Sequence, residues 1–182
     1  MLDADEYLHL AINSSQAGDH HAALEHLHKA LEKEPAHVGA RYFLAAEHAE
    51  LGLFERACAE MQELLMVAPE LDIARFQLGL LSLQLDRKES ALQAFAALVE
   101  SARDESLQSF ARAYLSLLED RKDDAIEQLE QGLRDCGNPA LKGDMSRVLA
   151  GLKQEAPPVT DDSGEVASPV FLGAYRNSDE TP

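Results

Sequence analysis

Residues 37–69 read HVGARYFLAAEHAELGLFERACAEMQELLMVAP, and this stretch decides the fold. It contains two segments rich in Ala, Leu and Glu, residues 37–51 and 54–67, separated by the turn Gly52-Leu53. Ala, Leu and Glu lose little side-chain freedom in a helix, whereas Pro69 cannot continue one. No β-branched run of alternating polarity appears in the chain. The stretch predicts two helices joined by a short turn, and the whole chain is predicted to be all-α.

The same pattern returns every 34 residues. A small Ala lets two helices approach closely, and a large apolar residue four positions later lies on the same helix face. A Pro then separates one unit from the next, because it cannot continue a helix. The alanines are Ala23, Ala57, Ala91 and Ala125, the apolar residues are Leu27, Met61, Phe95 and Leu129, and the prolines are Pro35 and Pro69.

With this spacing the chain resembles the tetratricopeptide repeat family, whose unit is a helix–turn–helix of 34 residues. The resemblance implies a right-handed α-solenoid over residues 1–155, with units near 4–37, 38–71, 72–103 and 104–138 and a capping helix at 139–155. The chain departs from the family signature where Tyr7, its first aromatic, is replaced by Arg41 and Arg75 in the next two units. Helices are predicted near 3–17, 20–33, 37–51, 54–67, 71–85, 88–101, 104–118, 122–135 and 139–155.

The fourth unit fits the family pattern better with a two-residue insertion in its first helix. The insertion places Leu107, Phe110-Ala111 and Tyr114 at repeat positions and lengthens the turn at residues 118–120. Without it, Arg112 falls on a core position, which costs several kcal/mol, on the order of 2–7, if the side chain is buried unpaired. We therefore expect the insertion.

The end of the chain changes in composition after the ninth helix. Asn138 and Pro139 form a good helix start, and a solenoid needs a terminal helix with a polar outer face. Residues 160–168 are rich in Asp, Ser, Gly and Glu, and residues 156–182 are expected to be a disordered acidic tail. The tail contains an apolar island, residues 169–175, with Phe171, Leu172 and Tyr175. Two interpretations stay open: the island packs loosely or has no role, or it is a short motif that docks a partner or the protein's own groove.

The charge of the chain excludes several classes of partner. With 33 acidic and 16 basic residues, the net charge is −17, which argues against nucleic acid and anionic lipid surfaces. No apolar run approaches the ~18 residues of a membrane span, and the acidic N-terminus is unlike a secretory signal. Cys58 and Cys136 match no metal or redox spacing, although a bridge in an oxidising compartment stays open. A cytoplasmic protein is expected.

The sequence offers one weak arrangement for chemistry. His21, Glu25 and His28 share one face of the second predicted helix, a spacing that can hold a transition metal. That face is expected to point to solvent and lacks a further strong ligand. No phosphate-binding loop or nucleophile motif occurs. We expect no enzymatic activity, no cofactor and no metal.

By the resemblance, the first helix of each unit lines a concave groove that binds extended or helical peptides. The inward residues are predicted to be Leu8, Ile12, Tyr42, Ala46, Phe76, Leu80 and Leu83. Such side chains supply contact area in binding sites, but they would also serve as core. Some family members clamp the acidic C-terminal peptides of heat-shock chaperones with Lys, Asn and Arg. The matching positions here hold Leu8, Ile12, Phe43, Ile73 and Gln77, so that ligand is not expected.

The sequence therefore favours an adaptor that holds a peptide or helix of a partner protein. An acidic protein with an apolar groove suits a hydrophobic or basic segment. Two alternatives are a bacterial secretion-type chaperone for a hydrophobic substrate and a regulatory module of an enzyme complex. The resemblance to secretion chaperones lacks their extra N-terminal dimerising helix. No oligomeric state is predicted.

Overall fold

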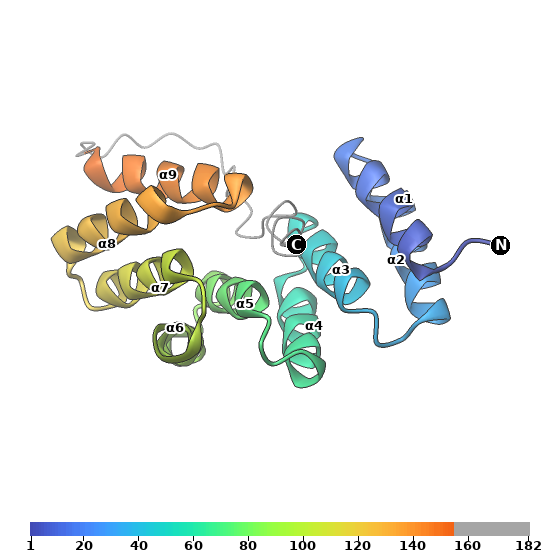
Figure 1. Ribbon diagram of the computed structural model, residues 1–182, viewed down its shortest axis with the longest axis horizontal. Helices are drawn as coiled ribbons and strands as arrows, with labels where there is room; N and C mark the ends of the chain where they lie inside the picture. The colour runs from blue at the N-terminus through green and yellow to red at the C-terminus, as the bar shows by residue number, and fades with distance from the viewer. Residues whose placement is uncertain (155–182) are drawn as a thin grey trace.

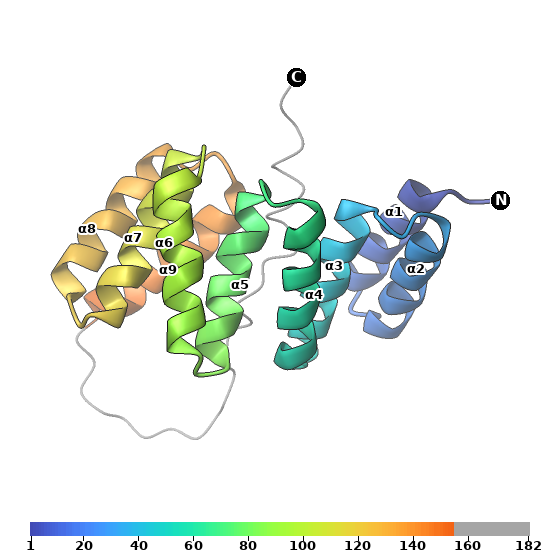
Figure 2. The same cartoon turned by 90° about the horizontal axis from the view of Figure 1, so that it is seen from below.

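The computed structural model describes residues 1–154, which form nine α-helices and no strand. Figure 1 shows them in chain order along a curved row, with α4 and α6 on the outside of the bend. In the view from below in Figure 2, the helices follow one another in chain order from α1 at one end of the molecule to α8 at the other. The helices are α1 (Ala4–Gln16), α2 (His20–Lys33), α3 (Val38–Glu50), α4 (Phe54–Val67), α5 (Asp72–Gln84), α6 (Lys88–Ser101), α7 (Glu105–Leu118), α8 (Lys122–Asp135) and α9 (Pro139–Lys153).

The predicted all-α solenoid is confirmed, and the second helix of every unit has the predicted bounds. The first helices are each shorter than predicted by one or two residues, and α9 ends at Lys153. The acidic tail with its island, including Phe171, Leu172 and Tyr175, lies outside the described residues.

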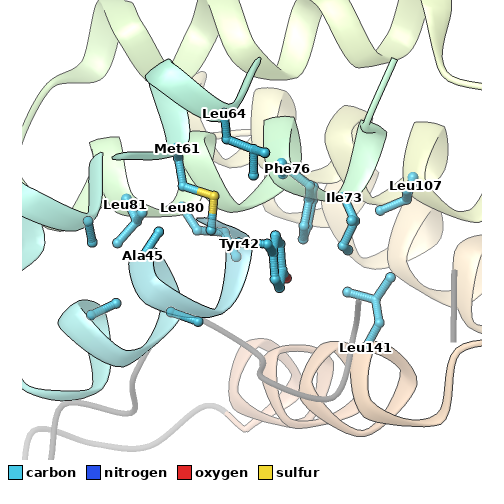
Figure 3. Packing of buried hydrophobic residues seen from close by; sticks show 14 of the residues in the cluster. Tyr42, Ala45, Met61, Leu64, Ile73, Phe76, Leu80, Leu81, Leu107 and Leu141 are labelled. Carbon is cyan, nitrogen blue, oxygen red and sulfur yellow. The ribbon is translucent and has the colours of Figure 1, made fainter. Parts of the chain in front are cut away.

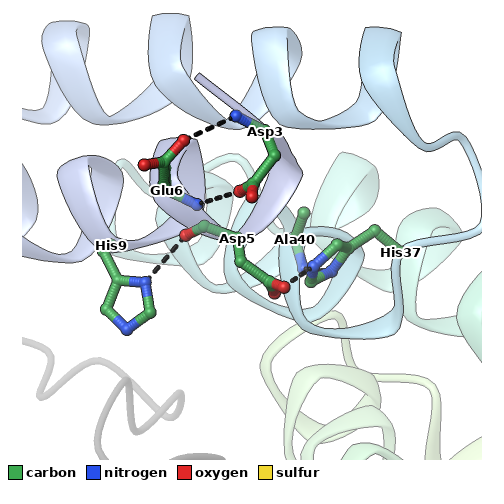
Figure 4. Close-up of polar contacts among 6 residues, drawn as sticks. All are labelled: Asp3, Asp5, Glu6, His9, His37 and Ala40. Atoms are coloured by element: carbon green, nitrogen blue, oxygen red, sulfur yellow. Dashed lines mark hydrogen bonds and ion pairs between the residues drawn. The ribbon is translucent and has the colours of Figure 1, made fainter. Parts of the chain in front are cut away.

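Polar side chains fix where several helices begin. At α1 the Asp3 carboxylate accepts the backbone N–H of Glu6 at 2.8 Å, and the Glu6 carboxylate accepts the N–H of Asp3 at 2.8 Å (Figure 4). This reciprocal cap satisfies two backbone donors that a helix start leaves open. At α3 the Nδ1 of His37 accepts the N–H of Ala40, so its Nε2 carries the proton and donates to Asp5 of α1 at 2.9 Å. The cap of α3 thus also joins the first two units.

The turns between paired helices repeat with the same 34-residue period. Each contains one residue in the left-handed region, with φ between 54° and 78°. Glycine takes this conformation without strain, and Asp is among the few other residues that adopt it. The residues are Gly18, Gly52, Asp86 and Asp120.

The insertion predicted in the fourth unit is wrong. Asp120 follows Asp86 by 34 residues, so the turn is not lengthened, and α7 only starts one residue earlier than the period requires. Arg112 does fall on the repeat position, but it is half-buried and its Nη2 donates to Gln108 Oε1 at 3.3 Å. A long side chain can lie along apolar surface while its charged end reaches a polar partner. The predicted penalty is avoided in this way.

The repeat residues form the core, as predicted from their spacing. Each first helix packs on the second helix of its own unit and, from α3 onward, on that of the unit before, and α9 packs on α8. Lys153 near the end of α9 pairs with Glu130 of α8. All eight of the repeated residues are fully buried: Ala23, Ala57, Ala91, Ala125, Leu27, Met61, Phe95 and Leu129.

Candidate functional site

The predicted groove residues lie on the first helices α1, α3 and α5, as expected, but most of them are covered. Tyr42, Ala46 and Phe76 are fully buried. Leu8 and Leu80 are also buried, whereas Ile12 and Leu83 are half-buried. The expectation of an open apolar line along these helices is therefore not met at its centre.

Phe76 shows the physical reason. Its ring centroid lies 5.8 Å from that of Phe95, 6.4 Å from that of Phe110 and 5.8 Å from that of Tyr114. Phe95 and Tyr114 stack with centroids 5.0 Å apart. Aromatic pairs in such offset and edge-on arrangements stabilise a core by about 0.5–1.5 kcal/mol beyond burial of their area. Phe76 therefore joins the third and fourth units from inside.

An open cleft lies beside this aromatic core, where α5, α7 and α9 begin. Its volume is about 760 Å³. Ile73, Leu107 and Leu141 form its buried floor, and half-buried Leu71 adds an apolar wall. Figure 3 shows Ile73, Leu107 and Leu141 directed toward one another from three helices. We call this feature the cleft.

The rim of the cleft is polar and mainly acidic. It carries three carboxylates, Glu70, Asp72 and Asp104, against one guanidinium, Arg103. Two of these carboxylates also hold the backbone: Asp72 Oδ2 accepts the N–H of Arg103 at 3.0 Å, and Asp104 Oδ1 accepts the N–H of Ser106 at 2.8 Å. The rim is therefore ordered by the helix starts and presents net negative charge.

The floor continues from Ile73 along α5 to Gln77, one helical turn later on the same face. The Gln77 side chain is fully buried, and neither its Oε1 nor its Nε2 has a hydrogen-bond partner among the described residues. An unsatisfied buried polar group costs about 1–3 kcal/mol. The Gln77 amide is therefore a buried polar group of the core.

Helix α3 is enclosed around its whole circumference. Its residues 42–49 are all buried, which is more than two helical turns without an exposed position. Among the described helices, α3 packs mainly against α1, α2 and α4.

The cleft is not among the features predicted from the sequence, although its signal is present there. Ile73, Leu107 and Leu141 are 34 residues apart, so α9 continues the repeat as the first helix of a further unit. In the family resemblance, Ile73 appears only as one of the positions that would bind an acidic chaperone peptide. Leu141 appears only as a residue on the apolar face of the predicted capping helix. Extending the period past the fourth unit groups all three.

The alternative metal arrangement is not assembled. Within residues 1–154, no group of three or more His, Cys, Asp or Glu side chains is placed to hold a metal ion. Glu25 instead accepts from Lys29 Nζ at 2.6 Å, and this hydrogen bond and charge lower the pKa of Glu25. His28 Nδ1 lies 2.7 Å from the carbonyl oxygen of Leu24. Over the same range, no helix has the length and hydropathy needed to cross a membrane.

Solved structures with the same fold include proteins of low sequence identity. The MamA protein superposes with a TM-score of 0.59 at 16% identity, covering 86% of this chain and 98% of that one. MamA from residue 41 to its end, from Desulfovibrio magneticus RS-1, gives 0.60 at 18%, covering 82% and 90%. TTC0263, a thermophilic TPR protein of Thermus thermophilus, gives 0.50 at 20%, covering 82% and 98%. At these identities the likeness shows the fold alone.

The family comparison agrees with the repeat spacing. No curated protein matches the sequence. Residues 15–81 match the tetratricopeptide repeat family model. The matched residues include the second helix of the first unit, the second unit and most of α5. Repeats of this kind stack into scaffolds for protein–protein interaction and are typically not catalytic. Residues 15–81 are therefore similar to tetratricopeptide repeats, and the match supports a protein of this family.

Proposed function

We propose that the protein is an adaptor that binds a peptide segment of a partner protein in the cleft. The segment has apolar side chains for the floor and Lys or Arg residues for the rim. The observation that carries the proposal is the cleft itself, whose volume of about 760 Å³ combines an apolar floor with a net acidic rim.

Apolar burial on the floor and charge attraction at the rim are together sufficient for a specific but reversible complex. Burying one Leu- or Phe-sized side chain on the floor contributes about 1.5–3 kcal/mol. The rim and the net charge of −17 attract a basic segment, which raises the association rate more than the affinity. Raising the salt concentration should therefore slow association.

A library of phage-displayed 12-residue peptides, panned against the full-length protein, tests this proposal. Enriched peptides are expected to combine apolar residues with Lys or Arg. Their synthetic copies should bind Leu71→Asp at least tenfold more weakly, a change of about 1.4 kcal/mol, in fluorescence anisotropy. Leu71 lines the cleft and occupies the N-cap of α5 without a side-chain cap. Because Asp is a favourable N-cap residue, the variant keeps its helix start while placing a charge in the cleft.

The matched control is Leu53→Asp. Leu53 is the uncapped N-cap residue of α4 and is 46% exposed, away from the cleft. Peptide affinity should not change in this variant. If enriched peptides bind Leu71→Asp as tightly as the wild type, the cleft is not the binding site and the proposal fails.

A further inference from the structure

We propose that a second, smaller pocket between α4, α5 and α6 receives a glutamate side chain of a partner protein, whose carboxylate pairs with Arg75. This pocket shares no lining residue with the cleft. The inference therefore goes beyond the proposed function and adds a contact of a different chemistry. Three observations support it: the lining of the pocket, the hydrogen bonding of Arg75 and the contrast between two repeat units.

The pocket lies over α5, between its two neighbours α4 and α6 (Figure 2). Its volume is about 220 Å³, below the range of about 300–1,000 Å³ for pockets that take drug-sized ligands, so it suits a single side chain. Its lining contains one guanidinium group, that of Arg75, and no carboxylate. In a chain of net charge −17, the lining of this pocket is thus positively charged.

Arg75 is fixed in position but has no acidic partner. Its Nη2 donates to the carbonyl oxygen of Pro69 at 2.6 Å, which holds the guanidinium group near the start of α5. Its Nε is buried without a hydrogen-bond partner, and the arginine ion pairs within residues 1–154 do not include Arg75. A guanidinium group has five N–H donors in a planar fork that matches a carboxylate. Arg75 therefore has donors left for an acid from outside.

The preceding unit shows how an arginine at this repeat position is paired. Arg41 lies 34 residues earlier, and its Nε also donates to a proline carbonyl oxygen, that of Pro35, at 2.7 Å. Its Nη1 lies 3.6 Å from Oε2 of Glu63 on α4. One helical turn away, Oε2 of Glu60 lies 2.7 Å from Nδ1 of His48. The second unit thus places two glutamates of its own beside these cationic or polar groups.

The third unit keeps the arginine and lacks both glutamates. At the corresponding positions, 34 residues later, it has Ala94 and Ala97 in place of the glutamates and Ser82 in place of the histidine. Arg75, Ser82 and Ala94 all line the pocket. The pocket therefore lies where the second unit places its own ion pairs, and a glutamate from a partner would restore the pairing of the arginine.

The other polar residues of the pocket also suit a carboxylate. The side-chain amides of Gln62 and Gln93 and the hydroxyl group of Ser90 are able to donate hydrogen bonds to its oxygens. The net charge of the chain repels a strongly acidic partner. We therefore expect a single glutamate within a segment of otherwise neutral or basic composition.

The probe for this site is N-acetyl-L-glutamate α-amide, which carries the glutamate side chain and no other charge. Titration into the ¹⁵N-labelled full-length protein should shift the backbone amide signals of Arg75 and Ser90, with a Kd of about 1–10 mM for a ligand of so few atoms. The uncharged N-acetyl-L-glutamine α-amide, at the same ionic strength, should bind about tenfold more weakly, because it cannot form the charge-assisted pair.

Two variants test the role of Arg75. Arg75→Gln removes the cation and should weaken the glutamate probe about tenfold. Ala97→Glu keeps Arg75 and copies the internal glutamate of the second unit, so it should weaken the probe to a similar extent by pairing with the guanidinium group. The matched control is Ala96→Glu, which adds the same charge at an exposed position of α6 and should bind the probe like the wild type.

Unshifted signals of Arg75 and Ser90, equal affinity for the glutamine probe, or undiminished binding to Ala97→Glu would overturn the proposal. Free glutamate that binds about tenfold more tightly than the blocked probe would assign the pocket to the free amino acid and overturn the partner assignment. Leu71→Asp, the variant that tests the cleft, should bind the probe like the wild type. Failure of the cleft and failure of this pocket are thus told apart.

Discussion

Gly79 of α5 occupies the repeat position where the other units have alanine, Ala11, Ala45 and Ala113. A Cβ at Gly79 would lie 2.6 Å from Cε1 of Phe95, closer than carbon atoms approach in packed proteins. Phe95 is the largest of the four apolar residues in its own repeat series. The glycine therefore compensates for the size of Phe95, and the two positions are coupled.

We expect Gly79→Ala to lower the free energy of unfolding by about 1–3 kcal/mol, because it overpacks the contact with Phe95. Adding Phe95→Leu should make the alanine less destabilising than it is in the wild type. Urea unfolding followed by circular dichroism measures both. Gly143→Ala on α9, where a Cβ meets nothing within 4 Å, should stabilise by about 0.5–1 kcal/mol. Additive effects of Gly79→Ala and Phe95→Leu would contradict the coupling.

Ionisation of Tyr114 should lower the stability of the folded protein at alkaline pH. Burial beside Phe95 and Phe76 raises the pKa of Tyr114 to about 12, because the charged phenolate loses its hydration. The folded state therefore holds this proton more tightly than the unfolded state, whose tyrosine has a pKa near 10. This contribution to stability is complete below about pH 10 and is lost progressively up to about pH 12.

The expected loss at Tyr114 is about 2 kcal/mol, measured by urea unfolding at pH 9 and at pH 11.5. Tyr114→Phe has no proton to lose, so its stability should fall less over this interval. A variant that falls as steeply as the wild type would show that other groups dominate alkaline unfolding.

At the scale of elements, the contacts between successive units, which we call joints, are polar in one place and apolar in the next. Between α2 and α3, His20 Nδ1 lies 2.8 Å from Oε2 of the buried Glu47. Thirty-four residues later, the corresponding positions at the joint of α4 and α5 hold Phe54 and Leu81. One joint thus has a polar pair where the next has apolar packing.

Removing one partner of the polar joint should be costly. His20→Ala leaves the Glu47 carboxylate buried and unpaired, and we expect a loss of about 2–4 kcal/mol in the free energy of unfolding. His20→Phe/Glu47→Leu copies the second joint into the first and should be neutral or stabilising, by up to about 4 kcal/mol. Thermal unfolding ranks the variants. If the double variant unfolds at a lower temperature than His20→Ala, the two joints do not share one geometry.

At the scale of the whole molecule, the net charge of −17 acts against compactness. The ion pairs within residues 1–154 that neutralise acidic groups, such as Glu25–Lys29, are mostly exposed and contribute little. Like charges on a folded surface repel one another, and salt screens this repulsion over about 10 Å at 0.1 M.

Raising NaCl from 20 mM to 500 mM should therefore increase the melting temperature, by roughly 2–4 °C for a change of about 1 kcal/mol. Differential scanning calorimetry at pH 7 measures the shift. Sodium sulfate is unsuitable here, because it also strengthens apolar burial. A melting temperature that falls with NaCl would show that attractive pairs outweigh the general repulsion.

The 34-residue period predicts the bounds of the helices to within one or two residues, because those bounds depend on short-range interactions. Helix starts, turns and the close approach of Ala57 to its partner helix depend on residues within a few positions of one another or on one helix pair. At Arg112 the family signature disagrees with the 34-residue period, and the two-residue insertion predicted from the signature is wrong. The signature treats the position as core, whereas the structure lets the Arg112 side chain reach Gln108.

By itself, the sequence determined the fold class, the repeat and the nine helices of residues 1–154. Only the tertiary structure decided that Phe76 is core and that Ile73, Leu107 and Leu141 form the floor of a cleft. Periodicity shows which residues share a helix face, but exposure of that face depends on side chains 34 or more residues away. Contacts such as that of Phe76 with Phe110 and Tyr114 join residues of different units, and no local pattern in the sequence predicts them.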